Sequence, residues 1–232
     1  ALEARQLRVL SILLDLDPSL AYAPTTSALT VSRYTCRLGK GHRASGWTLL
    51  HHAALMDYPE SFDMLLSAGV KSLSSSNRPA SLQSLLDRKD HNGRTALNIA
   101  CRYAKSDAIE GLLDQGANPV AVDELKYTPL HWISGDSITK AHVHCAKVLL
   151  SHPQSKRSGL VNKSDKRGHS ALQWAALHDT PVHRSLVQVL MQHGAVWTSE
   201  DLEIILQDIS LGLEDQPIPV DLSLCETDEE ED

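Results

Sequence analysis

One short phrase occurs four times in this chain of 232 residues, and it constrains the fold more than any other feature. The phrase places a Thr or Ser before the first apolar residues, a polar residue three positions later, and mostly small residues after that. Its four copies are GWTLLHHAA at 46–54, GRTALNIAC at 93–101, KYTPLHWIS at 126–134 and GHSALQWAA at 168–176. Repetition of this kind is typical of stacked units that cannot each bury a hydrophobic face alone. The sequence therefore predicts a repeat scaffold.

The hydroxyl residue of each copy is predicted to begin a short helix, because it can accept an otherwise unpaired backbone N–H. The polar residue three positions later can bond back, as in a capping box. These pairs are Thr48–His51, Thr95–Asn98, Thr128–His131 and Ser170–Gln173. A second helix is predicted after each copy, at 61–68, 108–115, 146–151 and 186–193. Three of these helices are predicted to end in a left-handed glycine, at Gly69, Gly116 and Gly194. The helix at 146–151 is predicted to end at His152-Pro153.

The resulting unit, a turn followed by a short helix and a longer one, resembles the ankyrin repeat. Thr128-Pro129-Leu130-His131 matches the family signature T-P-L-H, and the 33 residues from Thr95 to Thr128 equal the family period. Asp114-Gln115-Gly116-Ala117-Asn118 is similar to the family's turn. The resemblance covers about residues 46–196. It implies an all-α repeat solenoid, an ankyrin-repeat stack with insertions in the inter-repeat connections at 72–84 and 153–164.

The length suits one domain with appendages. We expect an N-terminal capping helix and a basic connection over residues 1–45, four ankyrin-like repeats over 46–196, a C-terminal cap helix over 197–212 and an acidic, disordered tail over 213–232. The chain opens on Ala1 inside a helical pattern, which is compatible with a fragment of a longer protein. No apolar run is long enough to cross a bilayer, and no signal peptide is recognisable.

Four scattered cysteines lack the spacing of a zinc site or a disulfide framework. We therefore expect reduced thiols and an intracellular protein, in the nucleus or the cytoplasm. His142-x-His144-Cys145 is the densest group of potential metal ligands, but residues two apart on a helix point in different directions. No nucleophile motif or phosphate-binding glycine loop is present. The sequence predicts no enzyme, no metal and no cofactor.

Aromatic residues make up only 4% of the chain, and three of them take related positions in neighbouring repeats. Trp132 and Trp174 occupy the same place in consecutive repeats, and Tyr127 precedes Trp132 by five residues. We expect these three to line a concave face as apolar anchors for a partner, with Asp136 and His178 beside them. The alternative is that they wedge between repeats as packing residues.

The same pattern is similar to the ankyrin domains of certain histone lysine methyltransferases, in which aromatic residues and an acid enclose a methylated lysine. Aromatic faces attract a quaternary ammonium through their quadrupole. This sequence departs from that pattern, because Tyr127 stands in place of one Trp and the acid, Asp136, is displaced by one residue. Packing or generic peptide contact is therefore favoured over a cage.

Charge divides the chain into a basic body and an acidic end. Thirteen of the 29 Asp and Glu lie in residues 200–232, which contain no Lys or Arg, so residues 1–199 carry 16 acidic and 22 basic residues. Many basic residues lie in the predicted connections: Arg33, Arg37, Lys40, Arg43, Lys156, Arg157, Lys163, Lys166 and Arg167. They are either scattered solvating charges or a basic edge that attracts an acidic peptide. Nucleic acid is not favoured, because no aromatic residues interleave with them.

These observations predict a monomeric protein–protein interaction scaffold or adaptor. We expect it to bind another protein or an acidic peptide through its concave face and through the basic edge formed by the connections between repeats, which are called fingers. One alternative is a chaperone or assembly factor whose acidic tail shields a basic client protein. A second alternative is a methyl-lysine reader of histone tails that uses an aromatic cage.

Overall fold

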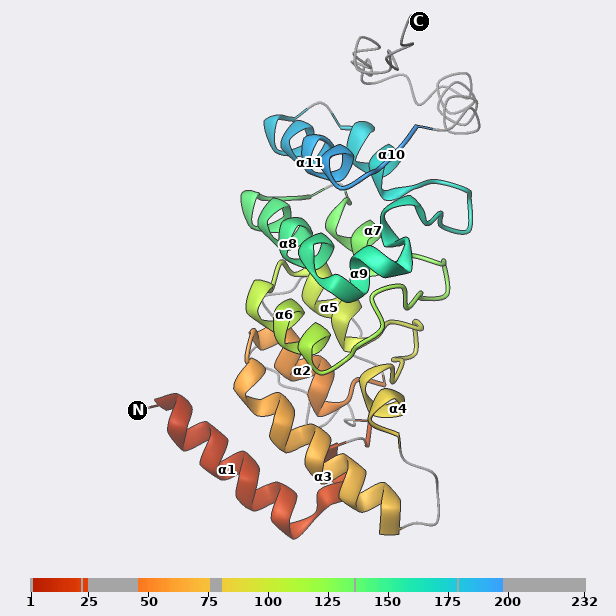
Figure 1. Ribbon diagram of the computed structural model, residues 1–232. Helices are drawn as coiled ribbons and strands as arrows, with labels where there is room; N and C mark the ends of the chain where they lie inside the picture. The colour runs from red at the N-terminus through yellow and green to blue at the C-terminus, as the bar shows by residue number, and fades with distance from the viewer. Residues whose placement is uncertain are drawn as a thin grey trace, which may run out of the picture.

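A computed structural model describes residues 2–21, 23–24, 46–75, 81–135, 137–178 and 180–197, and its helices stack in pairs from the N-terminal to the C-terminal end (Figure 1). The described residues contain no strand, and their one isolated β-bridge joins Ser164 to Ser170. Within the same residues no helix has the length and apolar character needed to span a membrane. The predicted all-α repeat stack is confirmed.

Four helix pairs form the repeats, each with a first helix that carries the repeated phrase and a second helix that follows it. The pairs are α2 (Leu49–Met56) with α3 (Phe62–Ser75), α5 (Ala96–Arg102) with α6 (Ser106–Asp114), α7 (Pro129–Ile133) with α8 (Lys140–Ser151), and α10 (Ala171–Ala176) with α11 (Pro181–Gln192). First helices contact first helices along the stack, and α6, α8 and α11 form the second layer (Figure 1). The core lies between these two layers.

Each first helix begins at the predicted hydroxyl residue, and all four capping boxes are present. In two of the boxes the Thr backbone N–H donates to a histidine Nδ1, so the histidine Nε2 carries the remaining proton. Three of the polar partners then reach the next repeat: His51 donates to the Arg94 carbonyl (3.1 Å), Asn98 to the Tyr127 carbonyl (3.3 Å) and His131 to the His169 carbonyl (3.0 Å). The phrase both caps its own helix and bonds that helix to the next repeat.

Two second helices begin in the same way, which sequence patterning did not reveal. Thr139 and His142 form a capping box at α8, and Thr180 accepts the His183 backbone N–H at α11. The Nε2 atoms of these histidines lie 3.2 Å from the Arg102 carbonyl and 3.3 Å from the Gly135 carbonyl of the preceding repeat. Histidines therefore join neighbouring repeats in both helix layers.

Glycine ends two second helices as predicted, since Gly116 and Gly194 follow α6 and α11 with φ of 93° and 87°. The prediction for Gly69 is wrong, because α3 continues through Gly69 to Ser75. A Cβ at Gly69 would lie 2.9 Å from Leu85 Cδ1, in α4 (Leu82–Leu86). Close approach of two helices, rather than a turn, explains this glycine.

Both predicted insertions contain helical structure. Residues 72–84 include the end of α3 and the start of α4, and η3 (Pro59–Ser61) precedes α3. Residues 153–164 hold α9 (Pro153–Ser158) and η4 (Leu160–Asn162), and α8 ends before Pro153 as predicted. Leu160 is 1% exposed, so the second insertion contributes to the core.

At the N-terminal end, α1 (Leu2–Leu16) and η1 (Pro18–Ala21) pack against α3 (Figure 1). Residues 25–45, which make up most of the predicted basic connection over 22–45, lie outside the described residues, as do residues 198–232, which include most of the predicted cap helix and the acidic tail. The predicted domain bounds therefore stay predictions.

Candidate functional site

Buried aspartates shape the fingers that connect the repeats. Asp90, Asp123 and Asp165 each accept the backbone N–H groups of the residues two and four positions later, at 2.7–3.0 Å. The residue three positions after each Asp has a positive φ: Gly93 (76°), Lys126 (60°) and Gly168 (93°). The signal in the sequence was an Asp five residues before each of the last three capping hydroxyls, and it was missed.

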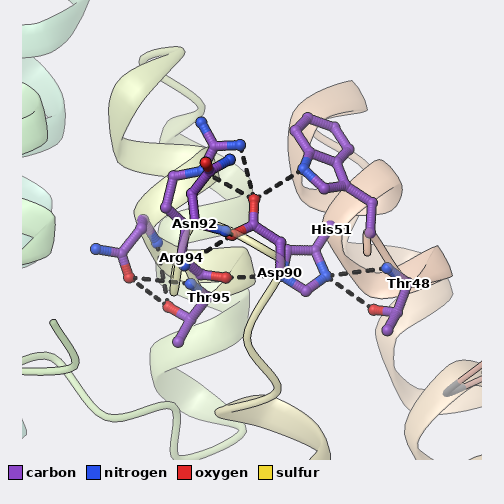
Figure 2. Close-up of polar contacts among 8 residues, drawn as sticks. Thr48, His51, Asp90, Asn92, Arg94 and Thr95 are labelled. Carbon is purple, nitrogen blue, oxygen red and sulfur yellow. Dashed lines mark hydrogen bonds and ion pairs between the residues drawn. The ribbon is translucent and has the colours of Figure 1, made fainter. Parts of the chain in front are cut away.

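The first of these aspartates also holds a buried ion pair (Figure 2). Asp90 Oδ2 lies 2.7 Å from an Arg94 guanidinium nitrogen and accepts the Trp47 indole N–H at 3.0 Å. Burial alone would raise the pKa of Asp90, but hydrogen bonds from Arg94 and Asn92 lower it below its usual value. The cluster keeps a charged carboxylate inside the finger and fixes Trp47 in a structural role.

Neighbouring fingers lie side by side, as the basic-edge hypothesis requires. Glu124 N donates to the Asn92 carbonyl (3.2 Å), and Lys166 N donates to the Leu125 carbonyl (3.0 Å). The predicted cations of α9 and the last finger are all exposed: Lys156, Arg157, Lys163, Lys166 and Arg167. None of the five forms an ion pair within the described part of the chain. The other four predicted cations, Arg33, Arg37, Lys40 and Arg43, lie outside the described residues.

The three predicted aromatic anchors come together in one groove. The Tyr127 ring centroid lies 5.6 Å from that of Trp132 and 5.6 Å from that of Trp174, with both rings edge-on. These residues line a groove of about 370 Å³ that also contacts α5 and the start of α8. All three are half-buried, so each offers surface to a ligand. Tyr127 is the ring that connects the two tryptophans.

Trp132 and Trp174 differ in how their indole nitrogens are satisfied. Trp174 Nε1 donates to Asp165 Oδ2 at 3.1 Å, which ties this ring to the last finger. Trp132 Nε1 is buried and meets no hydrogen-bond acceptor in the described chain. The packing alternative therefore applies in part to both rings: Trp174 is bonded to the last finger, and Trp132, which has no polar role within the repeat stack that the structure describes, packs against the hydrophobic core.

Sequence reasoning missed several lining residues of the groove, and the one charged side chain among them is Arg102 at the end of α5. Its guanidinium carbon lies 4.5 Å from the Trp132 ring centroid, in cation–π geometry, and 5.9 Å from that of Tyr103. Arg102 belongs to the repeat before Trp132, so only the stacking of repeats brings the two together. The only feature of the sequence that points to Arg102 is a basic residue at the end of the first helix of the preceding repeat.

The two histidines at the groove, His131 and His142, use their ring nitrogens in hydrogen bonds that hold the fold together. Burial lowers the pKa of His131 and of His142, against the opposing effect of the backbone carbonyls that they contact. Both residues use Nδ1 at their own cap and Nε2 at a neighbouring repeat. No group of three potential metal ligands occurs among the described residues.

Two predicted groove residues are not placed in the groove. His178 lies 4.6 Å from His183, measured between ring centroids, and does not line the groove. Asp136 lies outside the described residues. The binding roles assigned to all these residues stay predictions.

Stacked helix pairs, capping boxes that reach the next repeat and fingers built on buried aspartates define an ankyrin-type module. A family model described as ankyrin repeats (3 copies) matches residues 31–123 and 73–156. These matches span more than half of the chain, and the chain belongs to the ankyrin-repeat family. Ankyrin repeats generally mediate protein–protein interaction and are typically not enzymes.

Relatives contain similar repeats within much longer chains. Inversin from Canis lupus familiaris is 28% identical over 158 residues, which cover 68% of this chain and 12% of that protein. Inversin from Homo sapiens is also 28% identical, with 13% of its length covered. Neurogenic locus notch homolog protein 1 from Mus musculus is 29% identical over 137 residues, 48% of this chain and 5% of that protein. The chain thus spans a small part of the length of these relatives.

Proposed function

We propose that this chain is an adaptor module that binds a segment of another protein in the groove between α5, α7 and α10. The observation that carries the proposal is the joint exposure of Tyr127, Trp132 and Trp174 in one groove of about 370 Å³. Half-buried aromatic residues that converge in this way are the residues in which interface energy usually concentrates.

Charge on the neighbouring fingers supports the same proposal. Five exposed cations, from Lys156 to Arg167, lie in α9 and the last finger, and Asp165 between them is 5% exposed and engaged in hydrogen bonds. Exposed charge of one sign increases association rates and orients a partner more than it adds affinity. We propose that the groove supplies affinity and that the basic edge guides an acidic partner to it.

The two alternatives are weighed by different observations. The Arg102 guanidinium over Trp132 disfavours a methyl-lysine cage, because it already covers the ring face that a methylated ammonium would need. A chaperone role depends on the acidic tail, which lies outside the described residues. Deletion of residues 213–232 distinguishes that role, since a chaperone loses its client and an adaptor keeps its partner.

Selection from a random peptide library displayed on phage tests the proposal. Peptides enriched on the wild-type chain should lose about tenfold or more in affinity for Trp132→Ala, as expected for an interface anchor. Ile12→Ala is the matched control, because Ile12 is 52% exposed on α1 at the other end of the stack (Figure 1). Circular dichroism must show that both variants remain folded.

Two outcomes would count against the groove. Enriched peptides that bind Trp132→Ala as tightly as wild type would place binding on another surface. Loss of folded structure in Trp132→Ala would show that the ring is a packing residue. In that case Trp132→Phe, which keeps most of the apolar volume, should preserve both folding and binding if the groove is the site, and loss of binding with this folded variant would overturn the proposal.

A further inference from the structure

Helix α1 exposes an apolar stripe to solvent. Among the described residues, four of the large apolar side chains that are exposed lie on this one helix, and the others are spread over four separate segments. The stripe consists of Val9 (51% exposed), Ile12 (52%), Leu13 (46%) and Leu16 (79%). Spacings of three and four residues place these side chains on one side of the helix. Apolar side chains that are exposed together in this way mark an interaction surface, whereas single ones are ordinary.

The opposite side of α1 is buried in the stack. Leu14 is 4% exposed and Leu10 packs against the core, and α1 contacts η1 and α3 at the N-terminal end of the stack (Figure 1). The helix is therefore apolar on two sides, and the described chain buries one of them. A helix that is apolar all round is normally buried all round. The stripe thus has the composition of an interface.

Charges beside the stripe indicate which surface fits it. Arg8 and Asp15 are exposed and seven residues apart, so they lie on the same flank of the stripe, two turns or about 10 Å from each other. Neither forms an ion pair within the described part of the chain. The stripe runs from Val9 to Leu16, so a twofold axis close to Ile12 lays it antiparallel upon itself. The same axis sets Arg8 of each copy opposite Asp15 of the other.

We propose that the stripe binds the stripe of a second copy of this chain in an antiparallel, twofold-symmetric dimer. The apolar side chains pack together, and two Arg8–Asp15 contacts fix the direction of the helices, since a parallel pair would set equal charges at the same level. An anionic membrane surface fits less well, because Asp15 and Asp17 lie at one end of the stripe. The proposal is independent of the groove, and it competes with the monomer predicted from the sequence.

Sedimentation velocity at increasing protein concentration tests for the dimer. The wild-type chain should change from monomer to dimer between about 2 µM and about 200 µM, because a small interface gives a weak association. Leu16→Glu should stay monomeric, since it places a charge in the stripe at a position that is 79% exposed and outside the core. Leu125→Glu is the matched control, because Leu125 is 51% exposed on the finger before α7, and it should dimerise like the wild type.

Exchange of the two charges tests the antiparallel direction. Arg8→Glu and Asp15→Lys each create two like-charged contacts in the dimer, and at about 0.05 M salt each should raise the dissociation constant about tenfold. An equimolar mixture of the two variants has opposite charges at both contacts, so it should form a heterodimer with nearly wild-type affinity. Rescue by mixing requires position 8 of one chain to lie at position 15 of the other. A role of these residues in the fold of a single chain cannot produce it.

Three results would overturn the proposal. A wild-type chain that stays monomeric up to about 200 µM has no such dimer. Self-association that Leu16→Glu does not weaken would use another surface. Failure of the mixed variants to associate more tightly than either one alone would reject the antiparallel pairing.

These outcomes are separate from those for the groove. Ile12→Ala, the control for peptide binding, should weaken the dimer and leave the affinity for peptides unchanged. Circular dichroism should show that all these variants are folded, because the substituted side chains are exposed. Loss of the dimer with peptide binding intact would reject this inference alone.

Discussion

Acidification should destabilise this protein between about pH 6.5 and pH 4, because buried neutral histidines join its repeats. His51 is 1% exposed, and its pKa is lowered from 6.5 to about 4. Burial is the main cause, opposed by the Arg94 carbonyl and the Asp90 charge. Protonation would also place a second ring N–H against the Thr48 backbone N–H, which now donates to Nδ1 at 3.2 Å.

The sign and size of the effect follow from this shift. The pKa is lower in the folded state than in the unfolded state, so the unfolded state binds the proton first as the pH falls. The contribution of neutral His51 to stability is fully present above pH 6.5 and is lost as the pH falls towards 4. At about 1.36 kcal/mol per pKa unit, the complete loss is about 3 kcal/mol, and about 2 kcal/mol of it is reached by about pH 5.

The chain itself supplies a control residue that does not titrate. Asn98 occupies the place of His51 in the next repeat, where its side chain accepts the Thr95 N–H at 3.3 Å and donates to the Tyr127 carbonyl at 3.3 Å. His51→Asn should therefore preserve both hydrogen bonds and remove the titration. Urea unfolding of wild type and His51→Asn at about pH 7.5 and about pH 5 provides the four free energies of unfolding that the comparison needs.

We expect the wild type to lose about 2 kcal/mol more than His51→Asn over this pH range. Contributions of carboxylates and of the other histidines are common to both proteins and cancel in the difference. His131 and His142, whose pKa values are also lowered by burial, should show the same direction when each is replaced by Asn. Equal pH dependence in wild type and His51→Asn would refute the reasoning that protonation of this residue breaks the joint between repeats.

Three further predictions about the fold can be tested by urea or thermal unfolding. Leu130→Ala removes a side chain that is 0% exposed and should lower the free energy of unfolding by about 2–5 kcal/mol. Leu125→Ala is the control, because Leu125 is 51% exposed and its loss should change stability by less than about 0.5 kcal/mol. Equal effects of the two substitutions would mean that the repeat register is wrong. Lys126→Gly should stabilise the protein by about 1 kcal/mol, because the backbone at Lys126 is left-handed, with a φ of 60°. A loss of stability would show that the backbone is not strained at this position. Asp90→Ala should cost about 3–5 kcal/mol by leaving Arg94 buried without its partner, and Asp90→Asn should cost less.

The features that could be predicted from the sequence depend on residues close together in the chain. A capping box joins residues three apart, so Thr128 and His131 predict the start of a helix whatever that helix packs against. Gly116 is predictable for the same reason, since a left-handed residue after a helix is a local event. Gly69 has the same local context but lies inside α3, because its role is contact with Leu85, which approaches only through the fold. Contacts that a residue makes with other repeats cannot be predicted from the sequence around that residue.

The tryptophans show how this limit affects the candidate site. Trp47 and Trp174 lie at different positions of their repeats, yet each donates its indole N–H to a finger aspartate, at 3.0 Å and 3.1 Å. Trp132 shares its repeat position with Trp174 but has no such acceptor in the described chain, and it contacts Arg102 and Tyr127 instead. Position in the repeat therefore predicts that a ring faces the groove, but not whether the ring is needed for folding. Loss of an indole hydrogen bond inside the stack lowers stability together with binding. Substitution of Trp132 breaks no such bond, but its ring packs against the hydrophobic core, so Trp132→Phe, which keeps most of the apolar volume, is the substitution that can separate binding from folding.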